Sequence, residues 1–339
     1  MNWKDLGRFY LGRREAIEQV ATTKYLFWVS CLFIVSAGLA RNYDHHLLLE
    51  EPMWITGPFG MAFFSSFLIF GFLRLVCRIP LAPETHRFAN YTAWMRCFFL
   101  TAPLAWLYGI PYESFMPILP ATQLNFATLL VVSIWRVYLM GQTARTLYKL
   151  PTVVAYSAML IPASLEMMFG GVNKTLNLVG IMGGMRLSES DQFLVDATSF
   201  VVVVSFWLAV VSLIVFLIFT KKSKGRGYQE KVSGKMPHRI LTVAGISVLV
   251  WLGAATIYQP KLSNMKALRT AIHSKDLDLA VELLQQTPES DYPPGHDIFS
   301  RYYSNLNSKQ ALLAREAELP PWAVERLTKD VEALSNDPH

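Results

Sequence analysis

The sequence predicts an all-α membrane protein with about seven transmembrane helices and a small C-terminal α-helical domain outside the bilayer. Three observations predict this class: the composition, a series of long apolar segments, and the placement of basic residues between those segments. Of the 339 residues, 53% are hydrophobic and 17% are charged. Because soluble domains carry about 25% charged residues, lipid is the expected solvent for much of this chain.

Seven apolar segments are candidates for bilayer-spanning helices, each of which needs about 20 mostly apolar residues. These segments are residues 25–40, 53–73, 91–110, 119–141, 152–169, 198–220 and 240–258. The third and fourth are the least regular, because Pro103, Pro111, Pro117 and Pro120 fall within or between them. A kinked or partly re-entrant path is therefore left open for this region.

The basic residues predict the orientation of the bundle. With the N-terminus inside, the inner segments hold 19 lysines and arginines, whereas the short outer loops hold 3. Positive residues favour the cytoplasmic side. We therefore expect a multi-pass protein of the cell inner (plasma) membrane, with a cytoplasmic N-terminus and an extracytoplasmic C-terminus. This topology and anionic lipid explain the net charge of +6, so no nucleic-acid partner is expected.

The N-terminal region allows two interpretations. Residues 1–24 place Phe9, Tyr10, Ile17 and Val20 among basic neighbours, which predicts an amphipathic helix on the inner membrane surface. A helix that packs on the bundle is the alternative. Cleavage after "SAGLA", as in a signal peptide, is less favoured because the preceding charged region is longer than usual.

Residues 259–339 have no run long enough to span a bilayer and predict a helical tail domain. Ser263 is a candidate cap for a first helix, and "SKDLDLAVELLQQT" restarts a second. Ser308 is a candidate cap for a third helix, and Pro321 suits the first turn of the last. A unit of this size supports only a modest core, so we expect the tail to dock on the membrane part or on a protein partner.

The segment "RNYDHHLLLEEP", residues 41–52, is the first candidate site. If it is helical, His46 and Glu50 share a face, with His45 beside them, and such a pair could bind zinc or another transition metal. A third ligand would have to come from elsewhere, for example Glu166 or Asp196. The simpler interpretation is an amphipathic connector between two spans. No metal or other cofactor is therefore firmly predicted.

Charged residues inside predicted spans are the second group of candidates, because an ionisable group in a membrane suggests function. Arg96 and Arg136 fall near the inner ends of their spans, and Glu166 and Asp196 fall near the outer ends. Each could reach the interface by extending its side chain, so no charge is expected at the middle of the bilayer.

The glycine-rich residues 170–190 surround a ten-residue apolar stretch that is too short to span a bilayer. A surface loop on the outer leaflet is the favoured interpretation, and a segment that lines a cavity is the alternative. The "NKT" at Asn173 also matches a glycosylation acceptor. No P-loop, dinucleotide fingerprint, zinc-protease motif or nucleophile elbow is present in the sequence, so catalytic residues are unknown and an enzyme is not expected.

"FYLGRREAIEQVA" and "FIVSAGLARNYDHHLLLEEPMW" resemble the front of a group of uncharacterised bacterial multi-pass inner-membrane proteins. In that group a similar "SAGLAR-YD" block follows the first span, and an "EPW"-like block opens the second; here Met53 stands before Trp54. The resemblance covers about 70 residues and implies a bacterial inner membrane but no activity. "MWITGPFGMAFF" is more faintly similar to Yip1-domain proteins, which organise membranes and are expected to have five spans.

Three function classes follow from these features. The first is a non-catalytic scaffold or assembly subunit that presents its outer helical tail to a partner. The second is a transporter or channel for a small molecule or ion, using residues 170–190 and the outer acidic residues. The third is a membrane-bound metalloenzyme centred on His45, His46 and Glu50.

Overall fold

The structure is a computed structural model that describes residues 3–40, 47, 50, 53–77, 79, 89–180, 189–220, 234, 236–292 and 306–335. Within these residues every regular element is a helix, and no strand occurs. The elements of the bundle are α1 (Trp3–Tyr10), α2 (Arg14–Thr22), α3 (Leu26–Ala40), α4 (Met53–Cys77), α5 (Ala89–Phe99), η2 (Ala102–Gly109), η3 (Tyr112–Ser114), α6 (Ile118–Tyr148), α7 (Thr152–Gly180), α8 (Glu189–Thr220) and α9 (His238–Ser274). The remaining elements are α10 (Leu277–Gln286), η4 (Glu289–Asp291), α11 (Leu306–Leu313), η5 (Glu316–Glu318) and α12 (Pro321–Ser335).

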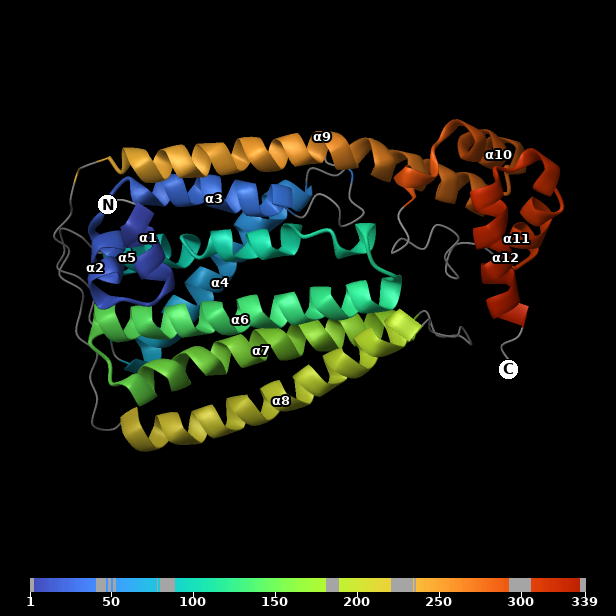
Figure 1. The fold of residues 1–339 in the computed structure, drawn as a ribbon. Coiled ribbons are helices and arrows are strands. Elements are labelled where there is room, and N and C mark those ends of the chain that lie inside the picture. Colours follow the sequence, from blue (N-terminus) through green and yellow to red (C-terminus); the bar gives the residue numbers. More distant parts are fainter. Residues whose placement is uncertain are drawn as a thin grey trace.

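Long helices lie side by side and form the main bundle (Figure 1). The N-terminus, α1 and α2 lie at one end of this bundle, and α10, α11 and α12 lie beyond the other end. In the described part of the chain, five helices are long and apolar enough to cross a membrane, and they fall within α4, α6, α7, α8 and α9. The predicted helical class with several candidate membrane-spanning helices is thus confirmed, whereas the count of seven spans and the separate C-terminal domain are not.

Two of the seven predicted spans are shorter than a membrane crossing requires. α3 has 15 residues, and most of its side chains are buried among α4, α5, η2 and α9. The third predicted span breaks after Phe99, and the chain continues as the 3₁₀ helix η2. Pro103 lies at the start of η2 and has no amide hydrogen to donate, which explains why the α-helix is not continued there.

α8 shows most clearly that lipid is the solvent of the bundle. Its large apolar side chains face outward, including Phe200 (70% exposed), Trp207 (60%) and Ile218 (63%). Ser205 and Ser212 are buried instead, on the side toward α7. Small polar residues between helices and large apolar residues outside are typical of a helix packed in a bilayer. A soluble protein rarely exposes an apolar surface this extensive.

Several helix boundaries differ from the sequence predictions. α7 continues to Gly180, so the first half of the predicted loop 170–190 is helical; residues 181–188 lie outside the described residues. α9 runs from the bundle into the tail without a break, so Ser263 lies inside this helix and caps nothing. α11 begins at Leu306, so Ser308 is not its cap either. The N-cap of α10 is Asp276, whose Oδ1 accepts from the amide of Leu279, and α12 begins at Pro321 as expected.

Residues 3–22 form two helices rather than one, and they dock on the end of the bundle. The chain turns between them at Gly12, whose φ of +70° favours glycine. Phe9, Ile17 and Val20 are fully buried in the same hydrophobic core as α5 and α7. The Tyr10 hydroxyl donates to the Leu100 carbonyl at 2.9 Å. These contacts match the alternative in which the N-terminal region packs on the bundle.

Candidate functional site

A polar cluster lies halfway along the bundle, where Arg136 and Glu166 occupy the same level. α6 and α7 are antiparallel neighbours joined by a three-residue connection after Tyr148 (Figure 1). At 1.5 Å per helical residue, Arg136 is about 18 Å from that end of α6, and Glu166 is about 21 Å from the matching end of α7. From the sequence, Arg136 was expected near the inner end of its span and Glu166 near the outer end. The difference arises because both helices are longer than the segments predicted from hydropathy.

Side chains from five elements form this cluster. The Ser65 hydroxyl on α4 donates to the Glu166 carboxylate, while Arg136 attracts that carboxylate through space. The guanidinium carbon of Arg136 lies 5.2 Å from the centroid of the Phe98 ring on α5, within the range of a cation–π contact. Tyr108 on η2 also interacts electrostatically with Arg136. An acid and a base thus interact electrostatically at this level of the bundle, where Glu166 is exposed and Arg136 is partly buried.

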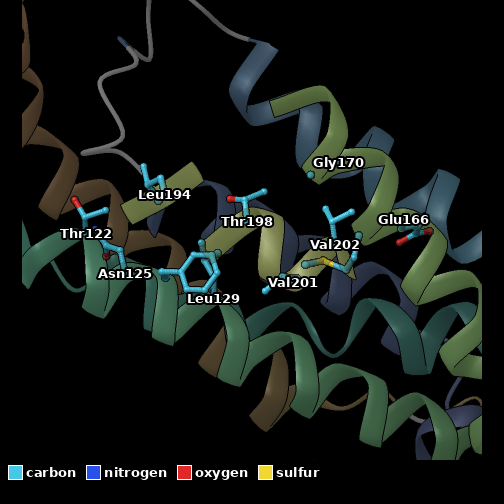
Figure 2. Close-up of a pocket in the computed structure, with 12 residues that line it drawn as sticks. Thr122, Asn125, Leu129, Glu166, Gly170, Leu194, Thr198, Val201 and Val202 are labelled. Atoms are coloured by element: carbon cyan, nitrogen blue, oxygen red, sulfur yellow. The ribbon is translucent and has the colours of Figure 1, made fainter. Parts of the chain in front are cut away.

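Glu166 also lines a groove between α6, α7 and α8, with a volume of about 570 Å³ (Figure 2). The lining residues are Thr122, Asn125, Phe126, Leu129, Glu166, Met167, Gly170, Gly171, Leu194, Thr198, Val201 and Val202. Glu166 is the one ionisable side chain in this set. The wall is mostly apolar, and polar side chains occur at Thr122, Asn125 and Thr198 toward the tail-side ends of α6 and α8. The volume falls within the range of about 300–1,000 Å³ usual for small-molecule sites.

Two adjacent glycines shape the groove differently. A Cβ atom on Gly171 would lie 2.4 Å from Cγ2 of Val202, so glycine allows α7 and α8 to approach closely there. A Cβ atom on Gly170 would meet no atom within 4 Å, so this position opens into the groove. The sequence favoured a surface loop for these glycines. They instead belong to a helix–helix contact and to the wall of a cavity.

The other two charged candidates have local roles. Arg96 is 7% exposed, and its Nη1 donates to the Ala21 carbonyl at 2.5 Å. That carbonyl lies in the last turn of α2, where the helix itself supplies no donor, so Arg96 fastens the N-terminal helices to α5. Asp196 is exposed on α8 and accepts from Gln192 at 3.0 Å. Neither residue lines the groove.

The described part of segment 41–52 contacts the tail. Glu50 forms an ion pair of 2.7 Å with Lys266 on α9, and Leu47 is buried in the hydrophobic cluster of the tail. Asp44, His45, His46 and Glu51 lie outside the described residues, so the predicted metal site cannot be placed. Among residues that the structure describes, no group of three or more His, Cys, Asp or Glu side chains could hold a metal ion.

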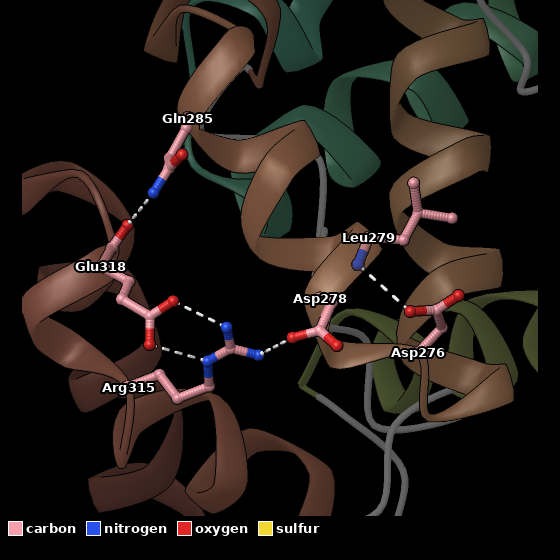
Figure 3. A network of polar contacts seen from close by, with 6 residues as sticks. All are labelled: Asp276, Asp278, Leu279, Gln285, Arg315 and Glu318. Carbon is pink, nitrogen blue, oxygen red and sulfur yellow. Dashed lines mark hydrogen bonds and ion pairs between the residues drawn. The ribbon is translucent and has the colours of Figure 1, made fainter.

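The tail, here the described residues from 259 onward, has a hydrophobic cluster of its own. Its fully buried members include Leu268, Leu284 and Leu327. Tyr292 stacks on Trp322 with ring centroids 5.2 Å apart. Figure 3 shows how Arg315 joins the helices at the surface: it donates to Asp278 at 2.6 Å and makes a two-pronged contact with Glu318.

Comparison of the chain with family models, curated proteins and solved structures gives no match. The resemblance in the first 70 residues therefore stays a prediction. Ser65, Phe98 and Tyr108, which surround the two charges, were not predicted from the sequence. Adjacent serines at 65 and 66 within a long apolar run were the available signal, because hydroxyls in a membrane helix usually face other helices.

Proposed function

We propose that this chain takes a small membrane-soluble molecule into the groove between α6, α7 and α8, as a binding or transport protein. The observation that carries the proposal is the position of Glu166: a carboxylate lines an apolar cavity halfway along a membrane-spanning helix. Placing an ionisable group there is costly, and such groups in membrane proteins mark ligand and ion pathways. This favours the transporter class over the scaffold that sequence alone ranked first.

The proposed orientation follows the basic residues. Lys24, Arg74, Arg145 and Arg239 all lie at the helix ends nearest α1 and α2. By the positive-inside rule this is the cytoplasmic side, so we propose an extracytoplasmic tail and a groove that opens toward the same side. The membrane proposed is a bacterial inner membrane, as the resemblance in the first span implies.

Photolabelling tests whether the groove is occupied. The purified full chain in lipid nanodiscs is labelled with a neutral alkyl diazirine, and the labelled residues are mapped by mass spectrometry. The proposal expects saturable labelling of groove residues on α6, α7 and α8. Gly170→Phe should abolish it, because the added ring enters open groove space.

Gly60→Phe on α4 is the matched control, since a Cβ atom there also meets no atom within 4 Å and Gly60 does not line the groove. This variant should leave the labelling unchanged. Labels spread evenly over the lipid-facing residues of α8, with no response to Gly170→Phe, would refute the proposal.

A scaffold is the second candidate function, and it is favoured by the way in which the tail is attached to the bundle. α9 is one 37-residue helix that begins in the bundle and ends within the hydrophobic cluster of the tail. The segment between α3 and α4 adds two further contacts: Leu47 is buried in the hydrophobic cluster of the tail, and Glu50 pairs with Lys266 on α9. These connections hold the helices of the tail in one position, where their surface can bind a protein partner.

A photo-crosslinking residue at Leu279, 42% exposed on α10, tests the scaffold in native membranes. One discrete crosslinked protein is expected, and it should be absent when the same residue stands at Phe200 on α8. Crosslinking to no protein at Leu279 or at other exposed tail positions would remove this candidate.

A further inference from the structure

We infer that the occupant of the groove is a hydrophobic organic cation, such as an amphiphilic amine or an onium ion, and that Glu166 recognises its charge. This inference rests on the proposed function, and it adds the chemical class of the ligand. It is carried by Glu166, which is the only ionisable residue among the described lining residues, by the polar atoms at the rim and by the position of Arg136.

The charges of the described lining residues favour a cation. Glu166 is exposed to the groove and is its only ionisable lining side chain. Arg136, which could hold an anion, does not line the groove, and its guanidinium rests against the Phe98 ring. In an environment of low dielectric constant, one carboxylate attracts a positive ligand much more strongly than it would in water. An anionic ligand would meet this carboxylate and no basic side chain among the described lining residues.

Hydrogen bonding at the rim points the same way. The Thr122 hydroxyl donates its proton to the Ile118 carbonyl at 2.8 Å, and the Asn125 amide donates to the Glu113 carboxylate. The oxygens of Thr122 and Asn125 remain as two acceptors, beside the one N–H of Asn125 that Glu113 does not use. Acceptor oxygens suit an ammonium group, whereas a phosphate or carboxylate ligand requires donors.

The apolar wall accounts for the hydrophobic part of the ligand. Phe126, Leu129, Met167, Val201 and Val202 present carbon surfaces, with Phe126 also packed edge-on against Phe193 at 5.9 Å between ring centroids. A ligand that enters from lipid already carries apolar groups, and these can replace lipid tails on the wall. A small hydrated inorganic cation would leave most of this wall without a partner.

Two ions of the same shape and opposite charge provide the test. Radiolabelled tetraphenylphosphonium and tetraphenylborate are equilibrated with the full chain in zwitterionic nanodiscs, and binding to empty nanodiscs is subtracted. The expected result is saturable binding of the phosphonium ion alone. Glu166→Gln should weaken that binding at least tenfold, equal to about 1.4 kcal/mol.

Asp196→Asn is the matched control, because Asp196 is an exposed carboxylate on α8 that does not line the groove. It should bind the phosphonium ion like the unmodified chain, and circular dichroism of both variants checks that they fold. Equal or tighter binding of tetraphenylborate, or full phosphonium binding by Glu166→Gln, overturns the charge inference. If groove photolabelling still responds to Gly170→Phe in that case, the proposed function stands; if neither ion binds and photolabelling also fails, both fall.

Discussion

Gly109→Ala is the sharpest test of how η2 and α9 meet. A Cβ atom at Gly109 would lie 2.0 Å from Cη2 of Trp251 and 2.6 Å from Cζ3. Since carbon atoms rest about 3.5–4.0 Å apart, the added methyl group requires a shift of about 1.5 Å or more. The indole is rigid, so the strain must move the whole side chain or one of the helices. Overpacking of this kind typically costs about 1–3 kcal/mol.

A double-mutant cycle separates this clash from other effects. The free energy of unfolding is measured in mixed detergent micelles for Gly109→Ala, Trp251→Leu and the double variant. Leucine removes the ring atoms that the new methyl group would meet, so the double variant should recover about 1–2 kcal/mol relative to the sum of the single changes. Gly253→Ala is the control: Gly253 lies on α9 like Trp251, and a Cβ atom there would meet nothing within 4 Å.

The control should be neutral or stabilise by up to about 1 kcal/mol, since alanine is the better helix former. If Gly109→Ala is as harmless as Gly253→Ala, the reasoning is refuted, because the two helices then cannot be in contact at this point. An additive cycle, with no recovery in the double variant, would contradict the assignment of the strain to Trp251.

Three further predictions follow. Gly12→Ala should destabilise by about 1–2 kcal/mol in the same unfolding assay, because the left-handed backbone at this position disfavours a side chain. Arg96→Gln should speed hydrogen exchange in α1 and α2, since a buried charged hydrogen bond worth about 1.5–3 kcal/mol is lost; unchanged exchange would contradict its capping role. The hydrogen bonds and charge of Arg315 hold the pKa of Glu318 below its ordinary value. The pair therefore stabilises the folded protein fully above about pH 4.3, the unfolded pKa of Glu, and this contribution is lost as the pH falls through the lower folded pKa. In thermal melts at several pH values, Glu318→Gln should lack this acid-dependent loss of stability.

Sequence patterns identified the membrane class because the physics of lipid burial depends on composition and length alone. The run around Phe200 is apolar on every side, and its exposure in the structure confirms that interpretation. Patterns also identified Pro321 as the start of the last helix. These features depend on residues close together in the chain, so local rules suffice.

Features that depend on packing were beyond those rules. Hydropathy ended the fifth predicted span near Phe169, yet α7 continues for eleven more residues because α8 packs along it. This error placed Glu166 near a helix end and hid its electrostatic interaction with Arg136. The contact of Leu47 with the tail was equally hidden, since it joins residues more than two hundred positions apart.

One consequence follows from α9. At 1.5 Å per residue its 37 residues extend for about 55 Å, which makes it a single rod shared by the lipid-embedded part and the tail. Pro260 lies inside α9 and has no amide hydrogen, so one backbone hydrogen bond of this helix is missing there. A force applied to α10, α11 and α12 would therefore bend α9 first at Pro260, and the remaining force would pass along α9 to α3, which packs against it.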